Sequence, residues 1–268
     1  MPRKSVIVGG GSNVTFGLLK DLYVQLEIGE RTSGKKGLTG DQLRAFVEHR
    51  NPFDLAQISA VLPYADEVVE SNIDYPEGFQ IRSVAEQVER LTKEFPNLDF
   101  SHAEELASGK LPEGAEGWGV IPKQSKVAEN YHGAFDKAIA LLAEQHGEKF
   151  ENWREGALTE KHLRLIEKTE KKLAKLEKET PGDCLVIPFQ FGKKWRGKSV
   201  RHAQIRFDDN EFGLGPYEVA ILLLTHPGRI IGSGQLYIDC GGCEYNPNET
   251  GDSFPFCLLF RWRSDYKR

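Results

Sequence analysis

The stretch that decides the fold is Gly213-Leu-Gly-Pro-Tyr-Glu-Val-Ala-Ile-Leu-Leu-Leu-Thr-His-Pro227. Its run of apolar residues predicts a buried helix over residues 217–225, because Pro216 suits the first turn of a helix and Pro227 ends one. Apolar or alternating segments on both sides of it predict strands, since they are bounded by turn-forming residues. These segments are residues 184–191, 200–207, 236–239 and 254–262, of which 200–207 also allows a helix.

Helical patterns precede the predicted strands. Two long helices are predicted over residues 125–145 and 159–179, and a helical hairpin would bury the apolar stripe of each. A coiled-coil dimer through the second helix is the alternative. Ser83-Val-Ala-Glu86 and Ser101-His-Ala-Glu104 both match the capping box that starts a helix. A further short helix is predicted over residues 43–47.

Strands that gather after helices, instead of alternating with them, are typical of an α+β fold. We therefore expect an α+β protein with a helical N-terminal region and a helical hairpin, followed by a small mixed β-sheet domain with one buried helix. The expected divisions are a weakly structured segment over residues 1–40, a small helical region over 41–110, a connector and hairpin over 111–181, and a sheet domain over 182–268.

The glycine-rich start resembles a phosphate-binding turn only in part. Gly9 and Gly11 fit the first two glycines of the dinucleotide fingerprint, but Val14 stands where the third is needed. We expect a flexible start that leads into a helix over residues 18–26.

Composition limits the function classes. The chain has 268 residues, of which 39% are hydrophobic and 28% charged, with a formal net charge of −5. This argues against nucleic-acid binding by the whole surface, while it allows a local basic site. The longest strongly apolar run, residues 219–224, is far shorter than the roughly 20 residues that span a bilayer. We expect a cytoplasmic protein without a membrane partner, since no signal peptide is evident.

Cys240-Gly-Gly-Cys243 places two thiols on either side of a glycine turn. Such a turn lets two thiolates face one ion, and zinc takes four ligands of this kind, often as two pairs. A second pair is missing, because Cys184 and Cys257 lie in apolar segments where free cysteines pack as small hydrophobes. The alternatives are a zinc site at Cys240 and Cys243, a redox pair, and reduced core thiols. Zinc is thus a candidate cofactor of this turn.

A basic turn follows the first strand predicted in the C-terminal region. Cations that alternate with an aromatic ring can neutralise phosphates and stack on a base. The alternative is a solvated turn whose charges pair with the acidic residues that follow it. The candidate nucleic-acid contacts are Lys193, Lys194, Trp195, Arg196, Lys198 and Arg201.

The acidic residues after the basic turn offer a different site. Carboxylates are the ligands that Mg²⁺ prefers, and a histidine beside them could take part in hydrolysis. The candidate residues are Asp208, Asp209, Glu211, Asp239 and His226. For His226 the alternative is a buried cap at the end of the apolar helix.

Four stretches resemble a group of uncharacterised bacterial proteins. They are Asn152-Trp-Arg-Glu-Gly156, Asn210-Glu-Phe-Gly-Leu-Gly-Pro216, Ala220-Ile-Leu-Leu-Leu-Thr-His-Pro227 and Tyr237-Ile-Asp-Cys240. The resemblance implies a bacterial, cytoplasmic origin and carries no activity.

The leading hypothesis from the sequence is non-catalytic binding of nucleic acid or another polyanion through the basic turn. The alternatives are a small metal-dependent hydrolase and a structural or interaction protein without a ligand site.

Overall fold

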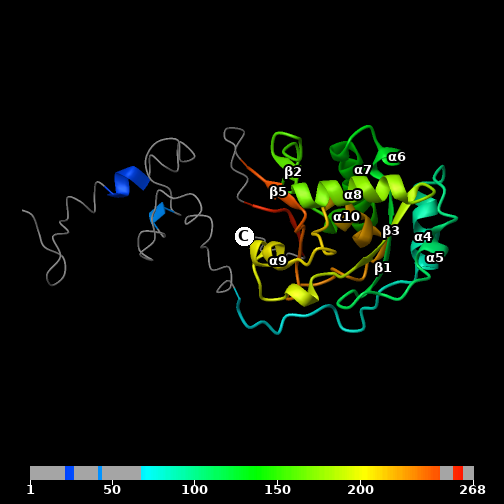
Figure 1. Cartoon of the computed structure of the whole chain (residues 1–268), viewed down its shortest axis with the longest axis horizontal. Coiled ribbons are helices and arrows are strands. Elements are labelled where there is room, and N and C mark those ends of the chain that lie inside the picture. The colour runs from blue at the N-terminus through cyan, green and yellow to red at the C-terminus, as the bar shows by residue number, and fades with distance from the viewer. Residues whose placement is uncertain (1–21, 27–41, 44–67, 248–255, 262–268) are drawn as a thin grey trace, which may run out of the picture. The chain divides into compact units, whose positions relative to one another are not determined.

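The computed structural model describes residues 22–26, 42–43, 68–247 and 256–261. The chain divides into two units, one made of residues 1–64 and 250–253 and the other of residues 65–249 and 254–268 (Figure 1). In the first unit residues 22–26 and 42–43 are helical. The glycine turn and most of the helix predicted over residues 43–47 lie outside the described residues.

The second unit is built around the helix α10, Pro216–Thr225, all ten residues of which are buried. A proline opens the helix, so the buried helix of the sequence analysis is confirmed. α10 packs against α7, Tyr131–His146, and against the strand β1, Gly117–Pro122. Tyr217 donates a hydrogen bond from its hydroxyl to the carbonyl of Pro122 at 2.8 Å, which fixes the start of α10 to the end of β1.

β1 pairs in antiparallel register with β3, Cys184–Phe189, so that Gly119 lies opposite Ile187. The connector expected at the start of residues 111–181 therefore contains a strand, in which Gly117, Gly119 and Pro122 lie. A Cβ at Gly119 would stand 2.7 Å from Cδ2 of Leu222, so glycine at this position lets the strand approach α10 closely. The pairing also joins segments on both sides of the division expected at residue 181.

α4, Val84–Glu94, begins at the first predicted capping box. The hydroxyl of Ser83 accepts from the amide of Glu86, and the Glu86 carboxylate accepts from the amide of Ser83 at 2.9 Å. The fully buried Gln87 ties the helix to β1, because its side chain donates to the carbonyl of Trp118 at 2.7 Å.

The second predicted capping box is wrong. α5, Ala103–Leu106, follows His102 and has no side-chain cap. Ser101 lies one residue too early, in a turn where its amide donates to Oδ1 of Asp99 at 2.9 Å. In place of a side-chain cap, the Ala103 amide donates to the Phe100 carbonyl at 3.0 Å, so the backbone of the turn leads directly into the helix.

Both long predicted helices begin with a different element. Residues 125–145 contain α6, Gln124–Val127, and then α7, which Asn130 caps by accepting from the amide of Gly133 at 2.8 Å. Residues 159–179 contain the strand β2, Leu163–Leu165, before α8, Glu167–Glu179. The main contacts of α7 are with α10 and those of α8 are with β3, so the two helices do not pack as the expected hairpin.

The remaining elements are short. They are η2, Gly147–Lys149; η3, Lys193–Trp195; α9, Val200–Arg206; β4, Ile238–Asp239; β5, Cys243–Tyr245; and β6, Leu259–Phe260. Residues 200–206 form a helix, which decides between the two possibilities that the sequence leaves open. The described strands form three antiparallel pairs, β1 with β3, β2 with β5 and β4 with β6, in place of the single mixed sheet that we expect from the sequence. The α+β class itself is confirmed.

Candidate functional site

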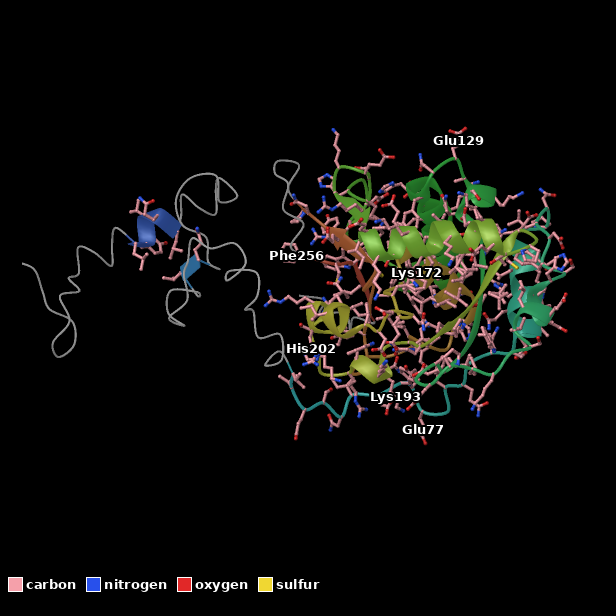
Figure 2. All side chains as sticks on the ribbon, in the orientation of Figure 1. Glu77, Glu129, Lys172, Lys193, His202 and Phe256 are labelled. Atoms are coloured by element: carbon pink, nitrogen blue, oxygen red, sulfur yellow. The ribbon has the colours of Figure 1, made fainter. Side chains whose placement is uncertain are left out.

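The basic turn is held by ion pairs. Lys193 and Arg196 both contact Asp74, with nitrogen–oxygen distances of 3.1 and 3.2 Å. Lys194 forms an ion pair with Glu211, one of the acidic residues that the sequence offers as partners. Three of the candidate nucleic-acid contacts therefore already have carboxylate partners, which favours the solvated-turn alternative. Figure 2 shows Lys193 at the periphery of the unit.

Trp195 is also engaged by its neighbours. The ammonium groups of Lys194 and Lys198 each lie 5.1 Å from the centre of its ring, which is cation–π distance. Phe207 packs edge-on against the same ring at 5.6 Å. Arg201 lies in α9, one turn further along the chain. Polyanion binding by this turn remains a prediction.

A buried arginine anchors the segment next to the basic turn. The Arg229 side chain is fully buried, and its two terminal nitrogens donate to the carbonyls of Leu236 at 3.0 Å and Phe191 at 3.1 Å. Its guanidinium lies 4.2 Å from the centre of the Tyr75 ring. Burial lowers the pKa of Arg229 to about 10, which leaves it charged at neutral pH. The Tyr75 hydroxyl in turn donates to Glu116 at 2.7 Å, so one network joins four separate segments.

The cysteine turn is rigid and buried. Cys240 and Cys243 are 0% and 1% exposed, and the Cys243 amide donates to the Cys240 carbonyl at 3.1 Å. Burial raises the pKa of Cys240 well above its ordinary value, and a hydrogen bond that its thiol donates to Cys243 adds to this. The glycines between them touch another segment, because a Cβ at Gly242 would lie 2.2 Å from the carbonyl oxygen of Gly213. Two enclosed thiols, of which Cys240 stays protonated, favour the core role.

The part of the chain that the structure describes contains no assembled set of metal ligands. No three histidine, cysteine, aspartate or glutamate side chains there converge on a point that could hold an ion. A zinc site at Cys240 and Cys243 remains a prediction. The described structure likewise does not bring Asp208, Asp209, Glu211, Asp239 and His226 together as the ligands of a hydrolase.

His226 lies at the end of α10, as a cap. Its Nδ1 lies 2.8 Å from the Leu222 carbonyl, which can only accept, so Nδ1 carries the proton. The rings of Phe79, Phe189 and Phe191 surround it at centroid distances of 6.3, 5.7 and 5.2 Å. Burial lowers the pKa of His226 to about 4, so it is neutral at physiological pH. This confirms the buried alternative for its position.

Tyr131 and Glu218 form a buried ionisable pair between α7 and α10. The Tyr131 hydroxyl donates to Oε2 of Glu218 at 2.8 Å, and it accepts from the Tyr217 amide at 3.2 Å. Burial raises the pKa of Glu218 to about 7, against the opposing effect of the tyrosine hydrogen bond. A Cβ at Gly215 would stand 2.7 Å from Glu218 Oε2. The pair is thus enclosed by protein, which gives it a structural role.

The larger of two cavities in the described part of the chain is lined by α7, by the segment after it and by β6, and we call it the α7–β6 cavity. Its volume is about 890 Å³. The apolar wall consists of Phe135, Ile139, Leu142, Phe150, Leu158, Leu223, Pro227, Ile230, Tyr245, Phe256, Leu258, Leu259 and Phe260. The polar lining consists of His146, Glu148, Lys149, Glu151, Asn152, Arg154, His226 and Arg261, together with Trp153 and Cys257.

Several lining groups of the α7–β6 cavity have displaced pKa values. Burial lowers the pKa of His146 and that of His226, and burial raises the pKa of the Cys257 thiol to about 12. Arg154 lies 5.1 Å from the ring centre of Tyr245, on the cavity wall. An apolar cavity with a few polar groups of perturbed pKa is the usual form of a ligand site.

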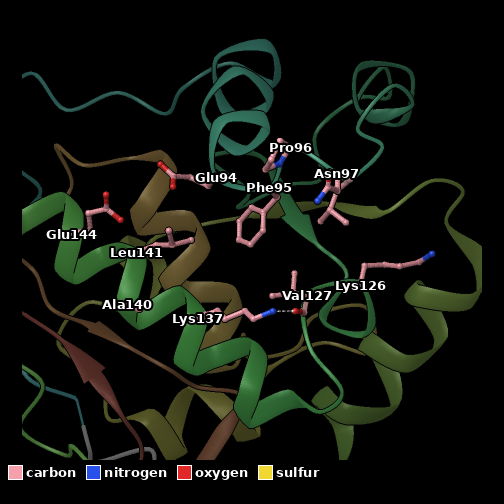
Figure 3. Close-up of a pocket in the computed structure, with 11 residues that line it drawn as sticks. Glu94, Phe95, Pro96, Asn97, Lys126, Val127, Lys137, Ala140, Leu141 and Glu144 are labelled. Carbon is pink, nitrogen blue, oxygen red and sulfur yellow. Dashed lines mark hydrogen bonds between the residues drawn. The ribbon is translucent and has the colours of Figure 1, made fainter.

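A smaller hollow of about 400 Å³ lies beside the turn after α4 (Figure 3). Three of its four charged side chains are already engaged. Lys137 donates to the Val127 carbonyl, Lys126 pairs with Asp183 at 3.0 Å, and Glu94 pairs with Arg90. We therefore assign no ligand to this hollow.

The α7–β6 cavity is the site that sequence reasoning misses. Its walls come from α7, from residues 148–158, from the end of α10 and from residues 256–261, which no short motif connects. The one available signal is Trp153, an exposed aromatic residue in a stretch rich in charge, with 62% of its surface accessible.

No helix among the described residues has the length and apolar character needed to cross a membrane. Comparison with models of protein families, with curated proteins and with solved structures gives no match for this chain.

Proposed function

We propose that this protein binds a small amphipathic molecule in the α7–β6 cavity. The observation that carries the proposal is the combination of size and lining. A volume of about 890 Å³ falls within the range of about 300–1,000 Å³ typical of small-molecule sites. Three cations, Lys149, Arg154 and Arg261, line the cavity beside two glutamates, Glu148 and Glu151, so an apolar ligand with a negative group fits its charge.

The test uses anilinonaphthalenesulfonate, an aromatic anion whose fluorescence rises in an apolar site. We expect one molecule per chain to bind. Ile139→Trp should weaken its binding about tenfold, because a large ring would occupy the cavity. Ile205→Trp is the matched control, since Ile205 is 57% exposed on α9 and does not line the cavity. Equal binding by the Ile139 variant, or an equal loss in the control, would contradict the proposal.

Polyanion binding through the basic turn is the second candidate, and the position of Lys198 favours it. No carboxylate among the described residues forms an ion pair with Lys198, whose ammonium instead lies over Trp195. Its charge can therefore neutralise a phosphate without the loss of an existing pair.

Lys198→Glu tests this candidate with single-stranded oligonucleotide as the probe. We expect salt-sensitive binding that weakens about tenfold in the variant. Lys175→Glu, on the exposed face of α8, is the control and should bind like the parent chain. Binding that is unaffected by salt, or equal in Lys198→Glu and the parent chain, would exclude the turn as a polyanion site.

A further inference from the structure

The strand β6 has an edge with unpaired backbone groups. The Cys240 amide donates to the Leu258 carbonyl at 2.8 Å, and Ile238 lies opposite Phe260. In an antiparallel pair, residues that exchange hydrogen bonds alternate with residues that do not. Leu259, opposite Asp239, is therefore a non-bonded position, and its N–H and C=O point away from β4. No backbone hydrogen bond among the described residues uses either group.

β6 lines the α7–β6 cavity. The cavity is lined by six consecutive residues, 256–261, whereas neither residue of β4 lines it. Leu259, whose backbone groups point away from β4, is one of the lining residues. Leu259 is 46% exposed and Phe256 is 58% exposed, so the edge can be reached from outside. Figure 2 shows Phe256 at the edge of the unit, away from Lys193.

Two cations flank the edge. Arg154 lies over the Tyr245 ring at 5.1 Å and Arg261 over the Tyr237 ring at 5.5 Å. No carboxylate among the described residues forms an ion pair with either guanidinium, and both residues line the cavity. Each can therefore pair with a carboxylate that a ligand brings.

We propose that the ligand of the α7–β6 cavity is an extended peptide segment that adds to the outer edge of β6 as a further strand. Its backbone pairs with the N–H and C=O of Leu259, its alternate side chains enter the apolar cavity, and an acidic group meets Arg154 or Arg261. Strand addition of this kind draws affinity from main-chain hydrogen bonds and specificity from side-chain pockets. The inference rests on the ligand-binding function proposed for this cavity.

The probe is the peptide acetyl-Thr-Val-Thr-Phe-Thr-Asp in two N-methylated series, each with alternate amides blocked. One series loses the amides that face β6 and the other loses those that face away. We expect one series to bind about tenfold more weakly than the parent peptide and the other to bind within about twofold of it. Equal affinities for both series, or no binding of the parent peptide, would overturn strand addition.

Leu259→Pro gives the same test from the side of the protein. Proline removes the outward N–H and leaves the bonds of Leu258 and Phe260 to β4 in place. We expect peptide binding to fall about tenfold in Leu259→Pro and by no more than about threefold in Leu259→Ala, which keeps the N–H but removes part of the apolar wall. An equal loss in both variants would assign the contact to the side chain and overturn the role of the edge.

Anilinonaphthalenesulfonate separates the two proposals. If this dye binds and the peptide does not, the cavity is a small-molecule site and strand addition is wrong. If neither binds, the function proposed for the cavity is wrong as well. A near-UV circular dichroism spectrum like that of the parent chain shows that Leu259→Pro keeps its tertiary packing.

Discussion

Arg229→Ala should lower the free energy of unfolding by about 4 kcal/mol, the largest effect that we expect from a single substitution. The side chain is fully buried and donates to the carbonyls of Leu236 and Phe191. Alanine leaves both carbonyls without these donors and opens a cavity against the Tyr75 ring. Urea unfolding of the variant and the parent chain measures the difference.

Arg154→Ala is the matched control for Arg229→Ala. Arg154 also lies over an aromatic ring, at 5.1 Å, but it is exposed. We expect a loss of about 0.5 kcal/mol, because an exposed cation–π contact is weak and no buried carbonyl loses a donor. A similar loss in both variants would show that burial is not the source of the effect.

Arg229→Met separates the hydrogen bonds from packing. Methionine fills much of the same volume but cannot donate, so the two carbonyls lose their donors without a large cavity. We expect a loss of about 2 kcal/mol, between those of the two alanine variants. Stability equal to that of the parent chain would mean that packing alone accounts for the effect at Arg229.

Elements with strong local signals are the ones that the sequence predicts correctly. α10 has an apolar run between two prolines, and α4 has a serine and a glutamate at capping-box spacing. These signals act within a few residues, so no distant partner is needed to interpret them. Each is confirmed at nearly the predicted boundary.

β1 is missed because its reason lies elsewhere in the chain. The residues around Gly119 in the sequence predict a loop. The need for glycine comes from Leu222, whose Cδ2 would stand 2.7 Å from a Cβ at this position. The same limit applies to the basic turn. Glu211 lies near enough in sequence to be proposed as a partner of the turn, whereas Asp74, which pairs with two of its cations, lies far upstream.

α9 shows how a weak signal can mislead. Ala203, Ile205 and Phe207 alternate, which favours a strand. Ser199 caps a helix instead, since its hydroxyl accepts from the His202 amide at 3.1 Å. The cap is the stronger local signal, because it satisfies an otherwise unpaired helical N–H.

Apart from Trp153, the α7–β6 cavity has no local signature in the sequence. Its lining combines α7 with residues 256–261, which meet only in the folded chain. Each lining residue by itself suits a core helix or strand. A ligand site of this kind becomes visible through the unfilled volume between elements, which no spacing of residue types encodes.

Glu218→Gln and His226→Gln should change the pH dependence of stability in opposite directions. The folded-state pKa of Glu218 is about 7, against an ordinary value of 4.5. Between these pH values the unfolded chain releases the proton that the folded chain keeps. Glu218 therefore contributes stability that is complete below about pH 4.5 and lost as the pH rises to about 7, a change of about 3 kcal/mol.

His226 acts in the reverse sense. Its folded-state pKa is about 4, against an ordinary value of 6.5. Below pH 6.5 the unfolded chain binds a proton that the buried, neutral imidazole does not. Its contribution is complete above about pH 6.5 and lost as the pH falls to about 4, again by about 3 kcal/mol.

The two contributions oppose each other between about pH 4.5 and 6.5, so the parent chain should show little change in stability from them there. In Glu218→Gln only the contribution of His226 remains, so the free energy of unfolding of this variant should rise with pH across this range. In His226→Gln only the contribution of Glu218 remains, so the free energy of unfolding of this variant should fall as the pH rises. Urea unfolding at intervals from about pH 5 to about pH 8 measures both slopes.

Glu104→Gln, which changes an exposed carboxylate on α5, should reproduce the parent profile. Parallel profiles for the two buried variants would show that neither group titrates as its burial requires.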